Sequence, residues 1–509
     1  MGLDLITIIF GMKVRQARLE AGLTLTDLAR HSEMSPSYLT EIEKGRKYPR
    51  ADKIVKMAAA LGKSYDEMVS IKLDPSLRYL ETTLASSTVR RFPFEEFGLE
   101  PADALGLVTR DPDRASALLH AILEIARRYD LKEEEFLRAA LRSYQEIHEN
   151  YFPDLEDAAE SFTQEYGARY GLDEGPLVPL ATLEAILLNE YGYSIDDTAI
   201  AATEELRHYR ALLLPGRRPQ LFINNRLYAR QVRFILAREI GYRYLGLKER
   251  SLTSTTDEVT SFQQLLNDAR AAYFGGALIM PRGRFLADLE DFFALPAWAS
   301  EPFSAMLTTY DVTPEMLLYR FSELIPQFFG LKLHFLRFHH TTGTDDYQLV
   351  RHLNMNQLLV PSGIGLFEHH CRRWLSIRLL PDAAAPGMVA SPLAAANPLP
   401  VGVQVSEFLE TGEKFLCLGF GRQMVLAPGV SSSVIIGFRV DAELHRAIRF
   451  LDDPDIPRTI IHETCERCPL RPDQCSVRTA PPTILNARRE QTARKIALNQ
   501  LKAHRSAGD

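Results

Sequence analysis

The chain has 509 residues, which is too long for one hydrophobic core and predicts about three or four domains of roughly 100 to 200 residues. Hydrophobic residues make up 46% and charged residues 25%, as in ordinary soluble globular proteins, and the formal net charge of -7 makes the chain acidic as a whole. No apolar run reaches the roughly 20 residues of a membrane span, and the run at residues 5–10 lacks the basic leader and cleavage site of a signal peptide. We therefore expect a cytoplasmic protein without a membrane partner.

Residues 23–49 predict two short helices joined by a turn. Thr24 is expected to cap the first helix and Ser35 the second, with Pro36 in the first turn of the second helix and Gly45 at its end. The polar side chains of the second helix stay on the outside, where they can enter a DNA major groove. We predict a double-stranded DNA operator as the partner, contacted by Arg15, Thr24, Thr26, Ser35, Ser37, Tyr38, Thr40, Lys44, Arg46 and Lys47.

Residues 11–68 resemble the Xre/Cro-type helix-turn-helix repressors, with matching stretches MKVRQARLEAGLT, EIEKGRKYP and ADKIVKMAAALG. This segment contains 11 Lys and Arg against 8 Asp and Glu, a net positive balance that suits phosphate binding. The family usually places a glutamine near the start of its first motif helix, where this chain has Leu25, so that DNA backbone contact is not implied here. The alternative is a five-helix packing module without a DNA partner.

A helical connector is predicted after this module. Residues 76–92 fit a linker helix, and residues 114–129 and 132–149 fit helices that each carry one apolar face. These faces need a partner surface. They could pair two subunits, so that a homodimer reads two DNA half-sites, or they could pack on the neighbouring domain. We predict a homodimer.

Mixed helix and strand follow over residues 155–281. The pattern predicts helices at residues 181–192 and 229–245 and two short strands, ALLLPG and PQLFINN, separated by a Pro-Gly turn. The stretches INNRLYARQVRFILAREIGYRYL and DARAAYFGGALIMP resemble the ImmA/IrrE metallopeptidase-like family. The resemblance implies a zincin-like α+β domain. Strands are expected again at residues 331–340 and 348–355.

The resemblance also locates a metal site that has lost its ligands. In this family an H-E-x-x-H helix binds zinc through two histidines, and its glutamate activates the zinc-bound water. Here Arg238 and Tyr242 occupy the histidine positions, Glu239 is retained, and Asp268 stands at the third, acidic ligand position. Since a guanidinium cannot bind zinc, we predict no catalytic residues and an internal ion pair of Arg238 with Glu239 or Asp268. The alternatives are a reused pocket and, for the whole protein, a metallopeptidase acting on a repressor.

Five cysteines form the last motif, and their odd number argues against a disulfide framework. HETCERCPLRPDQC contains Cys465, Cys468 and Cys475 on one loop, an arrangement typical of a metal site. Our choice for the fourth ligand is Cys371, and the alternatives are His369, His370 and His462. Cys417 lies in an alternating apolar strand and is predicted to be a buried core thiol. Unligated thiols are the alternative for the whole group.

The C-terminal part resembles the short-chain acyl-CoA regulators of the propionate-regulator type (PrpR/RamB). The matching elements are Cys371-x2-Trp374, GFRVDAELHRAIRFLDD, and CERC followed by Cys475 and APP, after the same two preceding domains. This resemblance implies a 4Fe-4S cluster on Cys371, Cys465, Cys468 and Cys475, with zinc as the alternative metal. It also implies a short-chain acyl-CoA such as propionyl-CoA as the effector, and control of genes for carboxylate metabolism.

The predicted fold class is multidomain, mainly α with α+β, and the basic tail is expected to be a helix. That helix could add contacts to DNA or coenzyme phosphates, or it could simply be solvated. The predicted boundaries are 9–70 for the Xre-type module, 71–152 for the connector, 153–360 for the degenerate ImmA/IrrE-like domain, 361–480 for the cysteine domain and 481–509 for the tail.

Overall fold

The computed structural model describes residues 5–70, 96, 133–172, 177–253, 259–356, 358, 368–383 and 399–506. The chain divides into two compact units, Met1–Tyr144 with Glu258–Leu266, and Gln145–Asp257 with Asn267–Asp509. Among the helices in the described ranges, none combines the length and the apolar character of a membrane-spanning segment. The helices predicted at residues 76–92 and 114–129 lie outside the described residues.

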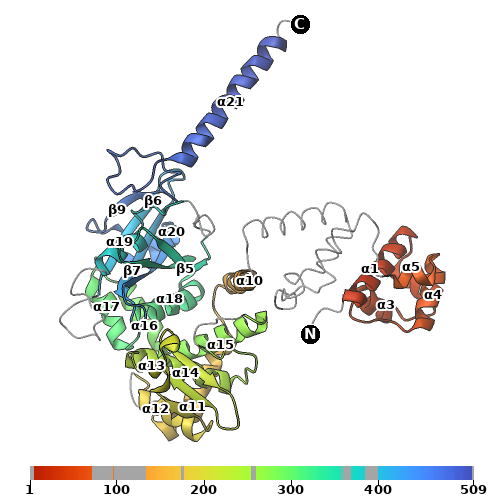
Figure 1. Cartoon of the computed structure of the whole chain (residues 1–509), viewed down its shortest axis with the longest axis horizontal. Helices are drawn as coiled ribbons and strands as arrows, with labels where there is room; N and C mark the ends of the chain where they lie inside the picture. The colour runs from red at the N-terminus through yellow and green to blue at the C-terminus, as the bar shows by residue number, and fades with distance from the viewer. Residues whose placement is uncertain are drawn as a thin grey trace. The chain divides into compact units, whose positions relative to one another are not determined.

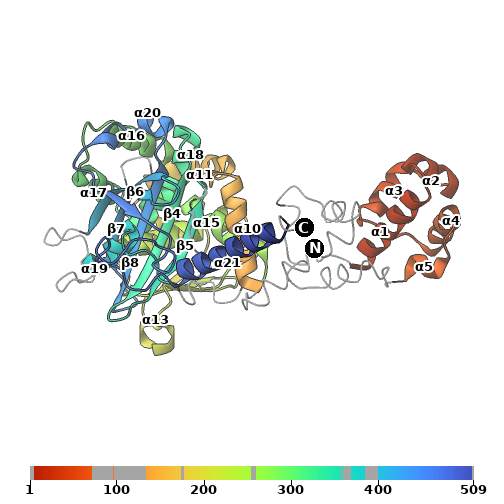
Figure 2. The same ribbon diagram turned by 90° about the horizontal axis from the view of Figure 1, so that it is seen from above.

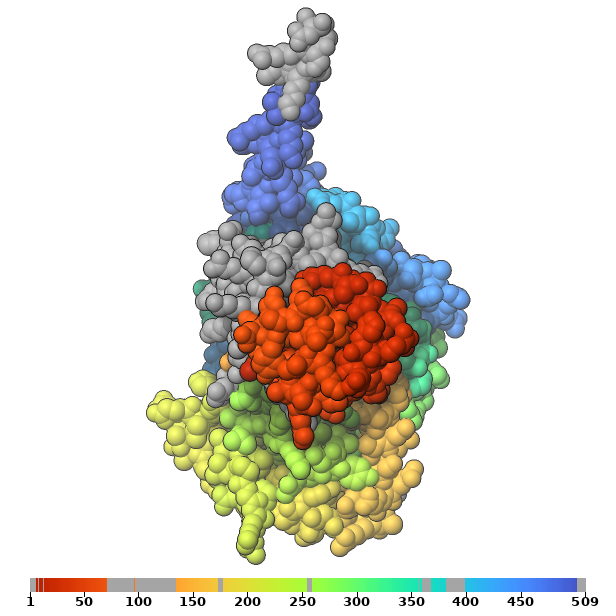
Figure 3. All heavy atoms as spheres, turned by 90° about the vertical axis from the view of Figure 1, so that its right-hand side faces the viewer, coloured from red at the N-terminus to blue at the C-terminus, as the bar shows by residue number. Residues whose placement is uncertain are grey.

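Five helices form the N-terminal module, whose atoms are red and orange in Figure 3 and pack together compactly. The two predicted motif helices are confirmed, together with their caps. The side chain of Thr24 accepts a hydrogen bond from the Asp27 backbone, and that of Ser35 accepts one from the Tyr38 backbone. Gly45, at φ +67°, ends the second of them in the left-handed region that favours glycine. The helices are α1 (Leu5–Glu20), α2 (Leu25–Ser32), α3 (Pro36–Glu43), α4 (Ala51–Leu61) and α5 (Tyr65–Val69).

Helix α3 is held firmly by its inner face and by α1. Leu39 and Ile42 are completely buried in the module's core. A Cβ added at Gly11 of α1 would lie only 2.2 Å from the Ile42 carbonyl oxygen, so glycine is required for this close approach. Arg18 of α1 also forms an ion pair of 2.6 Å with Glu43 at the end of α3. The outer face of α3 is therefore presented on a rigid support.

The predicted helix at residues 132–149 is α10 (Glu133–Ile147). Its buried Leu137 and Ala140 pack in one apolar cluster with Val259, Phe262 and Leu265, from the start of α15 (Phe262–Ile279) and the residues before it. This packing supports the second alternative for the apolar face of α10, contact with a neighbouring segment of the same chain. The homodimer stays a prediction.

The second unit begins with helices and a small sheet. The sheet has the order β1-β3-β2, with β1 parallel and β2 antiparallel to β3, and the two predicted short strands are β2 and β3. The predicted helices at 181–192 and 229–245 are confirmed as α12 and α14. The bounds are α11 (Pro153–Tyr170), α12 (Leu180–Asn189), β1 (Ser194–Asp196), α13 (Ala199–Ala202), η3 (Glu204–Leu206), β2 (Ala211–Leu214), β3 (Gln220–Ile223) and α14 (Ala229–Tyr244).

A six-stranded sheet in the order β5-β4-β8-β7-β6-β9 follows, with helices on both faces (Figure 2). Alternate residues of β7 face opposite cores: Leu416 and Leu418 pack in the cluster of α16 to α18, and Phe415 and Cys417 pack in the cluster of α19. The bounds are α16 (Arg282–Phe293), α17 (Ser300–Thr309), α18 (Pro314–Phe329), β4 (Leu333–Thr341), β5 (Tyr347–Asn354), α19 (Leu375–Ala383), β6 (Val401–Phe408), β7 (Lys414–Gln423), β8 (Val430–Arg439) and β9 (Arg458–Ile461).

This sheet differs from the predicted domain division. The two strands expected before residue 360 are β4 and β5, and β4 pairs antiparallel with β8 along its whole length. A boundary at residue 360 therefore divides strands of one sheet, because backbone pairing between distant strands leaves no mark on the local sequence pattern. After β8 come α20 (Ala442–Ala447) and η4 (Arg449–Asp452), and the predicted tail helix is α21 (Thr483–Ser506), which extends away from the sheet (Figure 1).

Candidate functional site

The outer face of α3 carries short polar side chains that the helix itself orients. Ser37 is exposed, and its Oγ lies 3.2 Å from the Oγ of Ser35, which caps the helix. Thr40 is half-buried, and its Oγ1 donates to the Pro36 carbonyl oxygen at 2.9 Å. Tyr38 of the same helix is also half-buried. The helix therefore offers hydroxyl groups at its N-terminal end, the part that reads base edges in helix-turn-helix complexes.

Basic side chains follow α3 on the same segment. Lys47 lies over the ring of Tyr38, with 5.0 Å between its Nζ and the ring centroid. Arg46 is exposed and forms an ion pair of 3.1 Å with Glu41. The other predicted DNA contacts lie at the start of α2, on α1 and after α3: Thr24 and Thr26 are exposed, and Arg15 and Lys44 are half-buried.

Leu25 takes part in the module's packing. It is partly buried against the core cluster, so its side chain stabilises the fold where the family's glutamine would touch DNA. The exposed hydroxyl-bearing face of α3 and the basic residues after it form the candidate DNA-binding surface. Whether each of these side chains contacts DNA stays a prediction.

The α14 positions predicted to form a degenerate zinc site are joined by a hydrogen-bond network. Arg238 donates from Nη2 to the Tyr242 hydroxyl at 2.7 Å, and that hydroxyl donates to Asp268 on α15. The Arg238 guanidinium also lies 3.7 Å from an Asp268 carboxylate oxygen. The predicted ion pair of Arg238 is thus formed with Asp268. Ser251, which sequence reasoning did not select, donates to the same carboxylate from its backbone N, at 3.1 Å, and from its Oγ.

Glu239 has a different partner, which the sequence pattern did not reveal. Arg250, from the loop after α14, donates to both carboxylate oxygens of Glu239, at 2.8 and 2.5 Å. The Tyr193 hydroxyl donates to Glu239 at 3.2 Å, and the Arg250 guanidinium lies 3.6 Å from the centroid of the Tyr242 ring. Glu239 is thus held in a buried, bidentate ion pair with a guanidinium.

The tyrosines of this network are held in their protonated form. Burial raises the pKa of Tyr193 to about 12 and raises the pKa of Tyr242 further above its ordinary range. A tyrosine binds a metal as the phenolate, so both side chains act here as hydroxyl donors. Within the described residues, no group of three or more His, Cys, Asp and Glu side chains is arranged to hold a metal ion.

Asp268→Asn is expected to destabilise the second unit by about 2–4 kcal/mol. The change removes the negative charge that pairs with Arg238. It also replaces a carboxylate that accepts several hydrogen bonds by an amide, whose NH2 group would face the hydroxyl donors of Tyr242 and Ser251. Thermal unfolding followed by calorimetry measures the effect. The matched control is Asp291→Asn on the exposed surface of α16, which should leave the Tm unchanged. Equal Tm values for the two variants would contradict this account of the network.

Backbone pairing joins the Cys371 segment to the loop that carries the other three cysteines of the motif. The Cys371 N–H donates to the Glu463 carbonyl at 3.2 Å, and the Cys465 N–H donates to the His369 carbonyl at 2.9 Å. Thr464 stands opposite His370 in this short antiparallel bridge. The fold thus joins two segments that are distant in the sequence.

The four thiols are buried and unbridged. Burial raises the pKa of Cys371 to about 11, and the charges of Cys465 and Cys468 add to the shift. Arg478 fastens the loop, since its Nη2 donates to the carbonyls of Cys465, at 2.6 Å, and Cys468, at 2.9 Å. The donor set suits a soft metal, but the described thiols are not gathered to the degree that metal coordination requires.

The remaining candidate ligands have different surroundings. His369 lies 2.7 Å from Glu466 through Nδ1, and burial lowers the pKa of His370 to about 4. His462 is buried, with its Nε2 3.3 Å from a Glu410 carboxylate oxygen. Cys417 is confirmed as a buried core thiol of β7, where burial raises its pKa to about 12.

Two family matches agree with this architecture. Residues 14–68 match the family described as Helix-turn-helix, and residues 198–322 match the IrrE N-terminal-like domain. The first match and the exposed face of α3 define a DNA-binding transcription regulator of the helix-turn-helix class. The second belongs to a protease-like family, so the absence of enzymatic activity stays a prediction.

A solved structure of a Mycobacterium tuberculosis transcriptional regulator is similar to this chain. It is 18% identical to this chain, and the similarity covers 67% of this chain and 92% of the other, with a TM-score of 0.46. No curated protein matches the chain.

Proposed function

We propose that this protein is a dimeric transcription regulator whose DNA binding responds to a short-chain acyl-CoA and to a metal centre on its cysteine loop. The observation that supports the metal centre is the backbone pairing of residues 369–371 with residues 463–465. It joins Cys371 to a loop that carries a Cys-x2-Cys pair and a third cysteine, all buried and free of disulfides. Four thiolate donors are a ligand set that suits iron-sulfur or zinc chemistry.

Cys371, Cys465, Cys468 and Cys475 would hold the metal. A 4Fe-4S cluster would make the domain responsive to redox state, whereas zinc would only stabilise the loop. The chain's own contribution is the support of the ligands: the antiparallel bridge at Thr464 and the hydrogen bonds from Arg478 hold the backbone on both sides of Cys465.

The effector is proposed to act by differential affinity. An acyl-CoA can change operator binding only if it binds one arrangement of the two DNA modules more tightly than the other. Control of carboxylate metabolism genes is the expected output. We do not propose peptidase activity, because Arg250 binds both oxygens of the only glutamate of the predicted degenerate zinc site.

The metal is tested on anaerobically purified protein by visible absorbance and by iron, sulfide and zinc analysis. A brown sample with about four irons per chain supports the 4Fe-4S cluster, and a colourless sample with about one zinc supports the alternative. Cys465→Ala should lose the metal, and the matched control Cys417→Ala should keep it. A wild-type protein with neither metal would refute the proposed centre.

The effector is tested separately, on DNA selected by the protein from a random-sequence pool. Propionyl-CoA is titrated into the protein–DNA complex, with free coenzyme A as the control, and affinity is followed by fluorescence anisotropy. A change in affinity with propionyl-CoA supports the proposal. If affinity and Tm stay constant, the effector part is wrong, while DNA binding by α3 is unaffected.

A further inference from the structure

A cavity of about 510 Å³ lies beside the cysteine loop and is lined by four arginines. Arg372 and Arg373 come from the turn before α19, Arg378 from α19 itself, and Arg458 from β9. Hydroxyl groups of Thr459 and Ser476 also line the cavity, and none of its described lining residues is acidic. The cavity is therefore strongly positive.

Within the part of the chain that the structure describes, two of the arginines contact only neutral partners. Arg373 donates to two backbone carbonyls, those of Gln474 at 2.5 Å and Ile460 at 3.3 Å. Arg378 donates to the side-chain oxygen of Gln404 at 2.8 Å. Among the described residues, neither guanidinium has a carboxylate within ion-pair distance. In contrast, Arg372 forms an ion pair of 2.7 Å with Asp345, and Arg458 lies 3.9 Å from Asp452.

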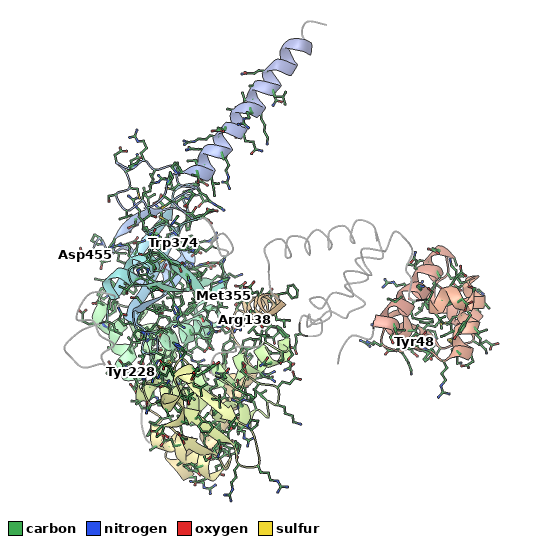
Figure 4. All side chains as sticks on the ribbon, viewed as in Figure 1. Tyr48, Arg138, Tyr228, Met355, Trp374 and Asp455 are labelled. Carbon is green, nitrogen blue, oxygen red and sulfur yellow. The ribbon has the colours of Figure 1, made fainter. Side chains whose placement is uncertain are left out.

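The arginines are positioned by buried groups. Gln404 of β6 is completely buried, and while its oxygen accepts from Arg378, its Nε2 donates to the Arg373 carbonyl at 3.1 Å and to Ser406 at 2.8 Å. Trp374, labelled in Figure 4, lies between Arg373 and the first turn of α19, and its Nε1 donates to the His462 carbonyl at 2.7 Å. The buried Gln404 amide thus holds the Arg378 guanidinium, and the amide and the buried indole together fix the backbone at Arg373 and Trp374.

We propose that this cavity binds a small organic phosphate through its phosphate group. Guanidinium groups match phosphate oxygens with paired hydrogen bonds, and two uncompensated positive charges balance a phosphate monoester or a diphosphate. The volume exceeds that of inorganic phosphate alone, so part of an attached organic group can also be enclosed.

The site is coupled to the cysteine loop through Arg373. The carbonyl to which its Nη2 donates belongs to Gln474, the residue before Cys475, and Arg373 itself follows Cys371 by two residues. A phosphate that draws the Arg373 guanidinium into the cavity competes with this hydrogen bond. The arginines alone define the phosphate site, so phosphate binding does not require a metal on the cysteine loop.

The test is isothermal titration of the full-length protein with sodium pyrophosphate, AMP and inorganic phosphate. Pyrophosphate and AMP should bind the wild type more tightly than inorganic phosphate does. Arg378→Ala should weaken their binding about 10- to 100-fold, and Arg378→Lys should weaken it less because the charge is retained. The matched control is Arg449→Ala, an exposed arginine of η4 outside the cavity, which should bind as the wild type does.

Several outcomes would overturn the proposal. Equal affinities for the wild type, Arg378→Ala and Arg449→Ala would show that the anions bind elsewhere. Inorganic phosphate binding as tightly as AMP would leave no role for an organic group. If a non-operator DNA duplex displaces pyrophosphate with an affinity that depends on Arg378, the cavity is a DNA contact. Since Arg378 is exposed, its variants should fold, which circular dichroism checks.

Discussion

Ser37→Glu is expected to weaken specific operator binding about 30- to 100-fold while leaving the fold intact. Ser37 lies exposed near the N-terminal end of α3, so a carboxylate there would meet the phosphates and base acceptors of the groove. A lost groove contact with a like charge in its place costs about 2–3 kcal/mol. Fluorescence anisotropy at a fixed salt concentration measures the change, and the same titration at several salt concentrations gives the number of phosphate contacts.

Ala59→Glu is the matched control for the change in charge. Ala59 is exposed on α4, and its replacement adds the same negative charge to the same module. We expect less than a threefold loss of affinity from it, since only the general electrostatic contribution changes. Similar losses for both variants would show that α3 is not the reading helix.

Glu156→Gln is expected to destabilise the second unit by about 3–5 kcal/mol. Arg320 is completely buried and donates to both oxygens of Glu156, at 2.7 and 2.9 Å, and to Glu323 at 2.9 Å. The Tyr273 hydroxyl also donates to Glu156, at 2.7 Å. Glutamine would remove the bidentate counter-charge of a guanidinium that water cannot reach. Calorimetric unfolding at pH 6 measures the loss.

Glu323→Gln is the matched variant. We expect it to change the free energy of unfolding little at pH 6, but to alter how that free energy depends on pH. One guanidinium cannot neutralise two carboxylates, and burial raises the pKa of Glu323 to about 8. Because this pKa is above that of the unfolded chain, the stabilising contribution of Glu323 is complete below about pH 4 and is lost as the pH rises towards 8. Glutamine resembles the protonated form, so the variant should lose this decline. If both variants were equally destabilised at pH 6, Glu156 would not be the main partner of Arg320.

The helix-turn-helix module could be predicted from the sequence because its signals are local. Thr24 and Ser35 cap helices that begin one residue later, and Gly45 adopts the conformation that ends α3. The requirement for glycine at position 11 could not be foreseen. It arises from the close approach of α1 to the carbonyl of Ile42, a residue on another helix.

At the predicted degenerate zinc site, the sequence did not determine which acidic residue pairs with Arg238. The sequence placed Arg238 and Tyr242 at the positions where the resemblance implies zinc-binding histidines, but it left two acidic partners for Arg238 open. The structure selects Asp268, because Glu239 is already bound by Arg250 from the following loop. Spacing within a helix predicts which residues share a face, but it does not predict which side chain a loop will bring to that face.

By itself, the sequence determined the two motif helices, α10, α12, α14, the tail helix, strands β2 to β5 and β7, and the chemical types available at each site, since capping, periodicity and side-chain chemistry act over a few residues. Only the tertiary structure decided which distant groups meet: β4 with β8 in one sheet, Arg320 with Glu156, and the four arginines around one cavity. These contacts follow from the burial of apolar faces and from backbone pairing between distant segments, which a local sequence pattern does not encode.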